Sequence, residues 1–351
     1  MRLSFVCVSA FVCLAAYASL AKPVKGLLNP KPQPYDTPER FVDIERLPIA
    51  GAEGNAVTYA MGYKLRPIGT DLFIGLSDLK ATQGPDGLTV EAVSDAGSFA
   101  TFTIPANHER RGPLTFELLR GTDGQVLGNK VLADAEALAV DERTGDYYIA
   151  FEGEPRVLRY RAEGSKAHSE KCEAVFGKKC ALEFKGAAER VPLQNLPSLP
   201  DNEGLEAMTL LRDKQGDASL LLGAESGGFW LCPLSTFNCA TIRGPKTPGF
   251  GYALVSLSAL PDRPDDILAL YRFYTPWTGP RTKLTHLRLE GGRLVSKGEL
   301  LTIAPPMPYA NYEGVSAIQT DGGYRLYLIS DPIEEDEEYT LLLGFDWAFK
   351  E

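Results

Sequence analysis

Three short apolar segments of this chain begin with the same acidic residue, and a second apolar segment that ends on another acid follows each of them. The leading residues are Glu136, Glu206 and Glu313, and the second segments end on Glu152, Glu225 and Asp331. Two more pairs of segments keep this frame without a leading glutamate. They start at positions 74 and 253 and end on Asp95 and Arg272. Five units in order indicate an array of repeats whose acids converge on one site.

The repeated units have the pattern of β-strands. Apolar and polar residues alternate in segments such as 98–104 and 284–289, and glycine-containing turns separate the segments. Residues 133–140 have a helix-forming composition but match the other units, so we expect a strand there. Four-stranded units repeated radially describe an all-β fold, a single β-propeller of five or six four-stranded blades. A strand within residues 40–66 can complete the last unit and close the ring, and a sixth, degenerate unit can lie in residues 40–70 or 100–132.

The N-terminal segment is expected to lie outside this domain. Arg2 precedes an apolar run that reaches Tyr17, and Ser19-Leu-Ala21 has the small residues that a signal peptidase recognises. We therefore expect a signal peptide at residues 1–21, a Pro-rich leader at 22–39 and one propeller domain at 40–351. The mature protein is then periplasmic or secreted, and no other segment is long and apolar enough to span a membrane.

The overall charge limits the partners. The 351 residues carry a formal net charge of −10, which argues against nucleic acid or an anionic membrane surface as a partner. We expect a small-molecule substrate and a monomeric protein. If that substrate is an anion, metal ions are needed to reconcile it with so acidic a chain.

The cysteines agree with export. Cys7 and Cys13 are lost with the signal peptide, and the four that remain are Cys172, Cys180, Cys232 and Cys239. The short separation within each pair favours two local disulfides in an oxidising compartment. A four-thiolate zinc site is the alternative, although such sites typically have about two to four residues between paired cysteines.

In a propeller, the first strand of each blade lines the central channel, so the repeated acids should meet at one mouth. Carboxylates at close range repel one another unless they are protonated, paired with cations or bound to metal. Oxygen ligands without histidine suit calcium, or another divalent cation such as magnesium. Arg272 is an internal counter-charge, and Asn202 and Asn311 can add neutral oxygen ligands. The predicted metal ligands are Glu136, Glu206, Glu313, Glu152, Glu225, Asp95 and Asp331.

A purely structural role is the alternative for these acids. A repeated glutamate can bond the backbone of the neighbouring blade, and Glu225 or Asp331 can simply cap a turn. The aromatic and basic segment 271–281 follows a second strand and should overhang the same mouth. It suits a ligand with a flat or anionic part, or it packs over the channel rim.

Other chemistries find little support in the sequence. The three histidines, His108, His168 and His286, lie off the repeated frame. Residues 223–227 read Gly-Ala-Glu-Ser-Gly, which has the serine one place too late for a nucleophile elbow. The fingerprints of phosphate-binding loops and dinucleotide-binding folds are missing from the sequence. The acidic run 334–338 is best explained as a solvated loop.

These repeats resemble the bacterial phytase-like family, whose members are described as having esterase-like activity. The resemblance covers roughly residues 70–347 and rests on the five pairs of segments in order, with the closing Leu-Leu-Leu-Gly-Phe-Asp346. It implies a propeller, export, and hydrolysis of phosphate esters or other esters. The chain departs from the family pattern at Tyr271, where the family usually has glutamate, and at Pro332, where it usually has a polar residue.

Three hypotheses follow. The first is an exported hydrolase of phosphate esters in which calcium is held at the channel mouth and catalysis involves Glu136, Glu206, Glu313 and Arg272. The second is a related hydrolase of lactones or carboxylic esters. The third is a propeller without enzymatic activity that binds a ligand or a protein through its rim.

Overall fold

The computed structural model describes residues 40–48, 56–68, 70, 73–107, 109–161, 187–199, 204–275, 277–308, 310–331 and 339–349. Several features predicted from the sequence lie outside these residues. They are the signal peptide, the leader, Cys172, Cys180, His108, His168, Asn202, Pro332 and the acidic run 334–338. No helix in the described residues is long and apolar enough to cross a membrane.

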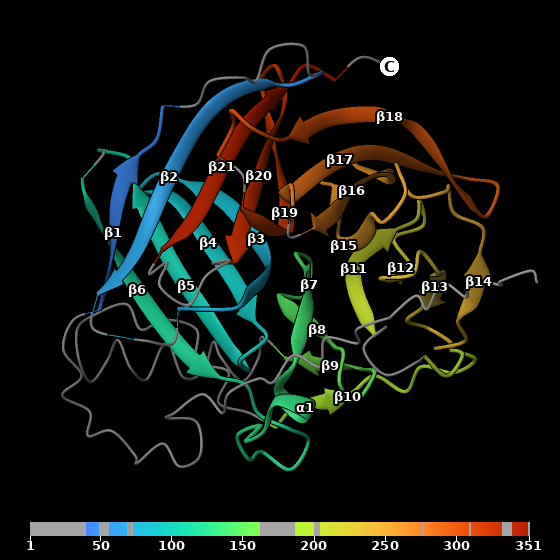
Figure 1. The fold of residues 1–351 in the computed structure, drawn as a ribbon. Helices are drawn as coiled ribbons and strands as arrows, with labels where there is room; N and C mark the ends of the chain where they lie inside the picture. The colour runs from blue at the N-terminus through green and yellow to red at the C-terminus, as the bar shows by residue number, and fades with distance from the viewer. Residues whose placement is uncertain are drawn as a thin grey trace, which may run out of the picture.

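The fold is all-β, as predicted, and three of its sheets have four antiparallel strands each (Figure 1). One sheet contains β7 (Ala135–Asp141), β8 (Asp146–Phe151), β9 (Arg156–Tyr160) and β10 (Glu189–Arg190). The next contains β11 (Leu205–Arg212), β12 (Ala218–Ala224), β13 (Phe229–Pro233) and β14 (Ala240–Ile242). The third contains β15 (Ala253–Leu260), β16 (Arg263–Thr275), β17 (Gly279–Glu290) and β18 (Arg293–Ile303).

The remaining strands form one nine-stranded sheet. One end holds β3 (Leu76–Gly84), β4 (Gly87–Ser94), β5 (Ser98–Pro105) and β6 (Arg111–Leu118). The other end holds β19 (Asn311–Thr320), β20 (Gly323–Asp331), β21 (Thr340–Trp347) and β2 (Thr58–Ile68). Strand β1 (Phe41–Arg46) pairs with both β2 and β6 and so joins the two ends. The predicted closing strand is therefore confirmed, because β2 pairs with β21.

The five first strands, β3, β7, β11, β15 and β19, lie next to one another in a closed ring at the middle of the molecule (Figure 1). Buried apolar clusters fill the spaces between neighbouring sheets. Side chains also connect adjacent first strands. The Thr209 hydroxyl accepts a hydrogen bond from the Ala259 amide at 2.9 Å, and the Ser316 hydroxyl accepts one from the Ala81 amide at 3.0 Å.

Local sequence explains the elements around this ring. Gly87 at the β3–β4 turn has a φ of 135°, and a Cβ there would lie 2.1 Å from the Ile104 carbonyl oxygen, so only glycine fits. The only helix in the described part of the chain is α1 (Lys130–Ala133), whose N-terminus is capped by Asn129. Residues 135–141 form β7, so the prediction of a strand rather than a helix is confirmed there.

Two details of the predicted repeat are wrong. The units without a leading glutamate were aligned at positions 74 and 253, but strand pairing puts their equivalent positions at Ser77 and Val255. Residues 98–118 supply β5 and β6, and residues 58–68 supply β2, so neither segment forms a separate sheet in the described part of the chain. The cause of the misalignment is a backbone irregularity that apolar periodicity does not reveal.

Candidate functional site

That irregularity is a β-bulge, and each of the five first strands has one at the same place. A bulge leaves one residue unpaired with the second strand, bends the strand and re-aims the side chain. The bulged residues are Ser77, Glu136, Glu206, Val255 and Glu313. We call these five residues the inner ring. The three leading glutamates therefore owe their common position to the same local backbone.

The second strands supply an equivalent set of residues. In each unit, the residue before the bulge pairs with a residue near the mouth end of the second strand, and the next residue of the second strand is charged. These next residues are Asp95, Glu152, Glu225, Arg272 and Asp331. We call them the outer ring. The five segment ends predicted from the sequence are thus structurally equivalent.

Tyr271 has a different environment from its neighbour Arg272. Its side chain is 2% exposed and packs in the core between sheets. Tyr271, where the related family usually has glutamate, therefore does not face the site, because successive residues of a strand face opposite sides. Arg272 alone occupies the outer-ring position.

Arg272 connects three of the predicted residues. Its guanidinium donates hydrogen bonds to Glu313 at 2.5 Å and to the Asn311 side-chain oxygen at 2.9 Å. Asn311 in turn donates to Glu313 at 2.8 Å. A longer contact of 3.9 Å joins Arg272 to Glu225. Arg272 is thus the counter-charge that the sequence predicted.

Two residues of the site were missed by the sequence reasoning. Lys130 of α1 forms ion pairs with Asp95, at 2.7 Å, and with Asp134. Asp134 also shares a hydrogen bond with Glu136. Asp134 stands two residues before its glutamate, as Asn311 stands two residues before Glu313, so this position of the repeat could have identified Asp134. Lys130 lies outside the repeat, and no sequence pattern indicated it.

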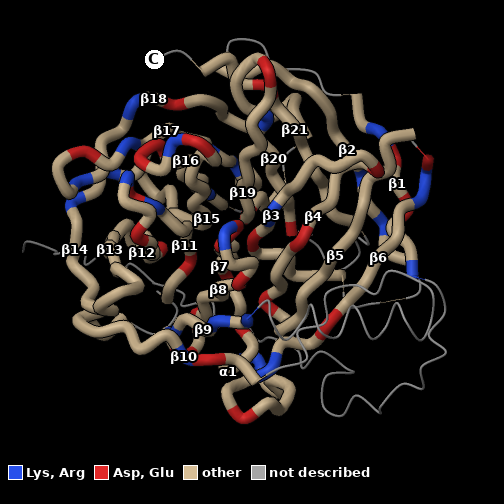
Figure 2. Tube along the Cα trace, turned by 180° about the vertical axis from the view of Figure 1, so that it is seen from behind, with Lys and Arg blue, Asp and Glu red and all other residues tan. Residues whose placement is uncertain are grey.

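Negative charge exceeds positive charge in this region. The acidic side chains are Asp95, Asp134, Glu136, Glu152, Glu206, Glu225, Glu313 and Asp331, and the cationic ones are Lys130 and Arg272. Figure 2 shows acidic and basic segments gathered where β3, β7 and β11 meet. Such an excess must raise carboxyl pKa values or attract a cation.

The carboxyl pKa values are raised. Burial, followed by repulsion from Glu152 and Glu225, raises the pKa of Glu206 to about 9. Burial and then repulsion from Glu313 raise the pKa of Asp331 to about 8. The pKa of Glu136 is raised well above its usual value by burial and then by repulsion from Glu206. At neutral pH, part of this cluster therefore holds protons.

Lys130 responds to the same field in the opposite direction. Burial by itself would lower its pKa, but attraction by Asp95 and Asp134 is stronger and raises it. Lys130 is thus a permanent cation of the site.

Two outer-ring acids also bond the backbone of the next unit. The Gly75 amide donates to Asp331 at 2.8 Å, and the Gly204 backbone bonds Glu152. Asp331 and Glu152 thus make the kind of backbone contact that the structural alternative assigns to the repeated glutamates. The principal neighbours of Glu136 and Glu206 are other acids.

One group of acids fits a metal ion. Ligand oxygens of Asp134, Glu136 and Glu152 all lie within 4.8 Å of one another. Three carboxylates without histidine or thiolate are a donor set for a hard cation such as calcium. Of the three leading glutamates, this group contains only Glu136, while Glu206 and Glu313 are its charged neighbours.

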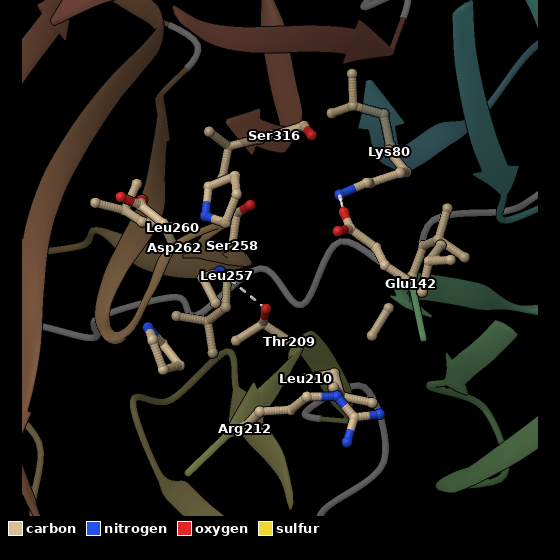
Figure 3. A pocket seen from close by; sticks show the side chains of 18 of the residues that line it. Lys80, Glu142, Thr209, Leu210, Arg212, Leu257, Ser258, Leu260, Asp262 and Ser316 are labelled. Atoms are coloured by element: carbon tan, nitrogen blue, oxygen red, sulfur yellow. Dashed lines mark hydrogen bonds and ion pairs between the residues drawn. The ribbon is translucent and has the colours of Figure 1, made fainter. Parts of the chain in front are cut away.

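A cavity of about 520 Å³ lies at the opposite end of the first strands. Figure 3 shows Lys80 reaching over it to form an ion pair with Glu142. Asp78 lies in β3 between the bulged Ser77 and the cavity-lining Leu79, and its carboxyl oxygens accept hydrogen bonds from the Leu138 amide at 2.8 Å and the Ser256 hydroxyl at 2.9 Å. The side chain of Asp78 thus spans the channel from β3 to β15.

The other polar predictions can be placed as well. His286 is buried away from both rings, and its Nε2 lies 2.6 Å from a carboxyl oxygen of Asp266. Cys232 and Cys239 form the predicted disulfide.

Comparison with known proteins identifies a family. The model of the phytase-like family, described as "esterase-like activity of phytase", matches residues 71–332, more than half of the chain. No curated protein matches the sequence.

Two solved structures are similar to parts of this chain. Hydrazine synthase from Kuenenia stuttgartiensis aligns with a TM-score of 0.36 and 13% identity over 77% of this chain and 61% of that chain, which is less than two thirds of its length. A protein of unknown function from Bacteroides thetaiotaomicron VPI-5482 aligns with a TM-score of 0.44 and 10% identity over 87% of this chain and 70% of that chain. Both likenesses are weak, and nothing about function follows from them.

Proposed function

The chain belongs to the phytase-like family, and from this premise we propose that it is an exported hydrolase of phosphate esters that uses calcium at the mouth formed by the two rings. The observation that carries this proposal is the meeting of acids from several units at one end of the first strands. We further propose that the fold is a five-bladed propeller, with β19, β20, β21 and β2 as the last blade. The apolar N-terminus and the Cys232–Cys239 disulfide support export.

Asp134, Glu136 and Glu152 are the residues that would hold the ion. A bound calcium ion would supply positive charge for a phosphate oxygen and would lower the pKa of a water molecule. The acids favour a bound cation, because a positive charge relieves the repulsion between their buried carboxylates. Gly204 and Lys130 orient Glu152 and Asp134 through the contacts described above.

Arg272 would bind the phosphate group of the substrate. A guanidinium has five N–H donors, and its planar fork matches two oxygens of a phosphate. Glu313 and Asn311 hold this fork in one orientation. Glu225, at 3.9 Å, is the weaker partner that a phosphate oxygen would replace.

Glu206 would act as the general acid. Its pKa of about 9 means that the folded protein holds a proton on this carboxyl at neutral pH. A protonated carboxyl beside the bound ester can donate that proton to the alkoxide that leaves when the P–O bond breaks. Burial is the largest cause of this raised pKa, and repulsion from Glu225 continues to raise it when Glu152 holds the ion.

The test is calorimetric and kinetic. The mature protein is treated with a chelator and assayed with phosphate esters and carboxylic esters, with and without added calcium. Glu136→Gln should weaken calcium binding about 10-fold or more, and Glu206→Gln should lower kcat about 100-fold or more. Arg272→Gln should raise KM with calcium affinity retained.

Glu142→Gln is the matched control, because Glu142 is an exposed acid at the opposite end of the first strands. This variant should change neither the calcium affinity nor the kinetic constants. Unchanged calcium affinity in both Glu136→Gln and Glu152→Gln would remove the metal from the proposal. Preference for carboxylic esters would favour the second hypothesis, and lack of any hydrolysis with every metal would favour a binding protein.

A further inference from the structure

The large hydrophobic side chains that are exposed in the described residues all lie at the mouth with the two rings. They are Ile74 (39% exposed), Val131 (59%), Phe250 (101%), Tyr274 (58%) and Trp277 (91%). Ile74 precedes β3, Val131 lies in α1 before β7, and Phe250 precedes β15. Tyr274 lies near the end of β16, and Trp277 lies in the turn between β16 and β17. Exposed apolar side chains on one face often mark a binding site, whereas apolar residues scattered singly over a surface are normal.

The aromatic members of this set all belong to one unit. Phe250, Tyr274 and Trp277 come from loops and strands of the sheet β15–β18. This unit is also the one without acids at the ring positions, because it has Val255 in the inner ring and Arg272 in the outer ring. The site is therefore asymmetric, with carboxylates on most sides and a cation beside aromatic rings on the remaining side.

Tyr274 stands directly beyond Arg272 on the same strand. Alternate residues of a strand face the same side, so Tyr274 shares the face of Arg272 and lies about 7 Å further along β16. On the other face, Phe273 packs on Tyr252 with 5.4 Å between ring centroids. This contact fixes the strand end, so the orientation of Tyr274 follows from the fold.

Trp277 is presented by a turn that is itself tied down. The hydroxyls of Thr275 and Thr278 lie 2.7 Å apart, and the Thr278 amide donates to Thr275. The indole is nonetheless almost fully exposed, so it does not pack over the channel rim. The packing alternative considered for this segment is therefore wrong for Trp277. Trp277 is thus exposed at the end of the hairpin that carries Arg272, where it is suited to contact a ligand.

We propose that Tyr274 and Trp277 form an aromatic wall that binds a flat, apolar alcohol group of the substrate while Arg272 binds its phosphate. This inference rests on the proposed function and specifies its substrate class: phosphate monoesters of aromatic or similarly flat apolar alcohols, in preference to esters of small polar alcohols. A polyphosphorylated substrate would place further negative charge next to Glu225 and Glu313, and the cations Arg281 and Lys283 of the same hairpin pair with Phe273 and Tyr271, on the strand face opposite to Arg272 and Tyr274. An aryl group next to the phosphate would cover exposed apolar surface instead.

The experiment measures binding without requiring catalysis. Phenylphosphonate and methylphosphonate have a P–C bond that an ester hydrolase does not cleave. They differ only in the group on phosphorus, which is a phenyl ring in one and a methyl group in the other. Calorimetry with calcium present should give about 3- to 10-fold tighter binding of phenylphosphonate, the range expected for aromatic contacts. The chain has three tryptophans, of which Trp230 and Trp347 are buried, so phenylphosphonate should change the emission of Trp277.

Variants locate the effect. Tyr274→Ala should bring the two affinities to within about twofold of each other, and Tyr274→Phe should restore the preference because the ring is retained. Val131→Ala is the matched control, since Val131 is an exposed apolar residue on another unit at the same mouth. It should keep the preference for the phenyl compound.

The outcomes separate the two proposals. Equal affinity for both phosphonates, or no binding of either, overturns the aromatic wall. A phenyl preference that persists when Tyr274 and Trp277 are both replaced by alanine overturns it as well. A phenyl preference that Tyr274→Ala abolishes, in a protein that hydrolyses no ester, supports the wall and refutes the proposed catalytic function alone.

Discussion

Replacement of Asp78 by asparagine should stabilise the protein relative to the wild type, and this advantage should grow as the pH rises from 4 to 8. Asp78 is 1% exposed and lies where the five first strands meet. Burial raises its pKa to about 8, although hydrogen bonds from the Leu138 amide and the Ser256 hydroxyl oppose this effect. At neutral pH, the folded protein therefore holds a proton on Asp78 that the unfolded chain releases.

The size of the effect follows from this difference in pKa. Between an unfolded pKa of 3.8 and a folded pKa of about 8, the folded state binds more protons. Stability therefore falls as the pH rises through this window, by about 1.4 kcal/mol per pH unit and on the order of 5 kcal/mol in total. The stabilising contribution of protonated Asp78 is fully present below pH 4 and is lost above pH 8. Asparagine does not titrate, and its amide can both accept from Leu138 and donate to Ser256.

The measurement is the free energy of unfolding of both proteins in urea, at several pH values between 4.5 and 8.5 and in the presence of a chelator. The ring carboxyls titrate in both proteins, so the difference between the two free energies isolates Asp78. This difference should increasingly favour the asparagine variant as the pH rises. Asp217→Asn, at an exposed position, controls for the loss of a negative charge. A difference that stays constant over this pH range would refute the reasoning.

Other predictions concern packing, the disulfide and the metal. Gly314→Ala should cost about 1–3 kcal/mol, because a Cβ would lie 2.9 Å from three neighbouring atoms, whereas Gly322→Ala, with nothing within 4 Å, should be nearly neutral; thermal unfolding compares them. Replacement of Cys232 and Cys239 by alanine should cost about 2 kcal/mol, since the bond closes a short loop; similar urea midpoints for both proteins would contradict this. Calcium at 100 times its Kd should stabilise the wild type by about 2.7 kcal/mol. Glu136→Gln should lose most of this gain at the same calcium concentration, and an equal rise of Tm in both proteins would count against the site.

The outer ring was predictable from the sequence because it depends on a simple pattern. Each second strand has an apolar segment near the mouth, and the first charged residue after that segment is the ring residue. The pattern identified Asp95, Glu152, Glu225, Arg272 and Asp331 without any knowledge of strand pairing. The closing role of β2 was predictable for a related reason, since the last unit lacked one strand.

The inner ring was predictable only where glutamate marks it. A β-bulge adds one residue to a strand and shifts the alternation of faces, and an apolar segment gives no indication of the shift. Ser77 and Val255 are therefore misaligned by the sequence pattern, whereas Glu136, Glu206 and Glu313 are not. The grouping of Glu136 with Asp134 and Glu152 depends on how neighbouring sheets are placed, which sequence alone does not give.

The position of Asp78 has a consequence for how any substrate reaches the rings. Asp78 occupies the place after the bulge where the other units have Ala137, Ala207, Ser256 and Gly314. A larger side chain at this one place reaches across to Ser256 at 2.9 Å, and a contact at that distance leaves no room for water between the two groups. Asp78 therefore narrows the space between the cavity and the acids on the line from β3 to β15. In the function that we propose, substrate enters and both products leave by the mouth that carries the rings, and the proposed aromatic wall then stands on the path of the alcohol in both directions.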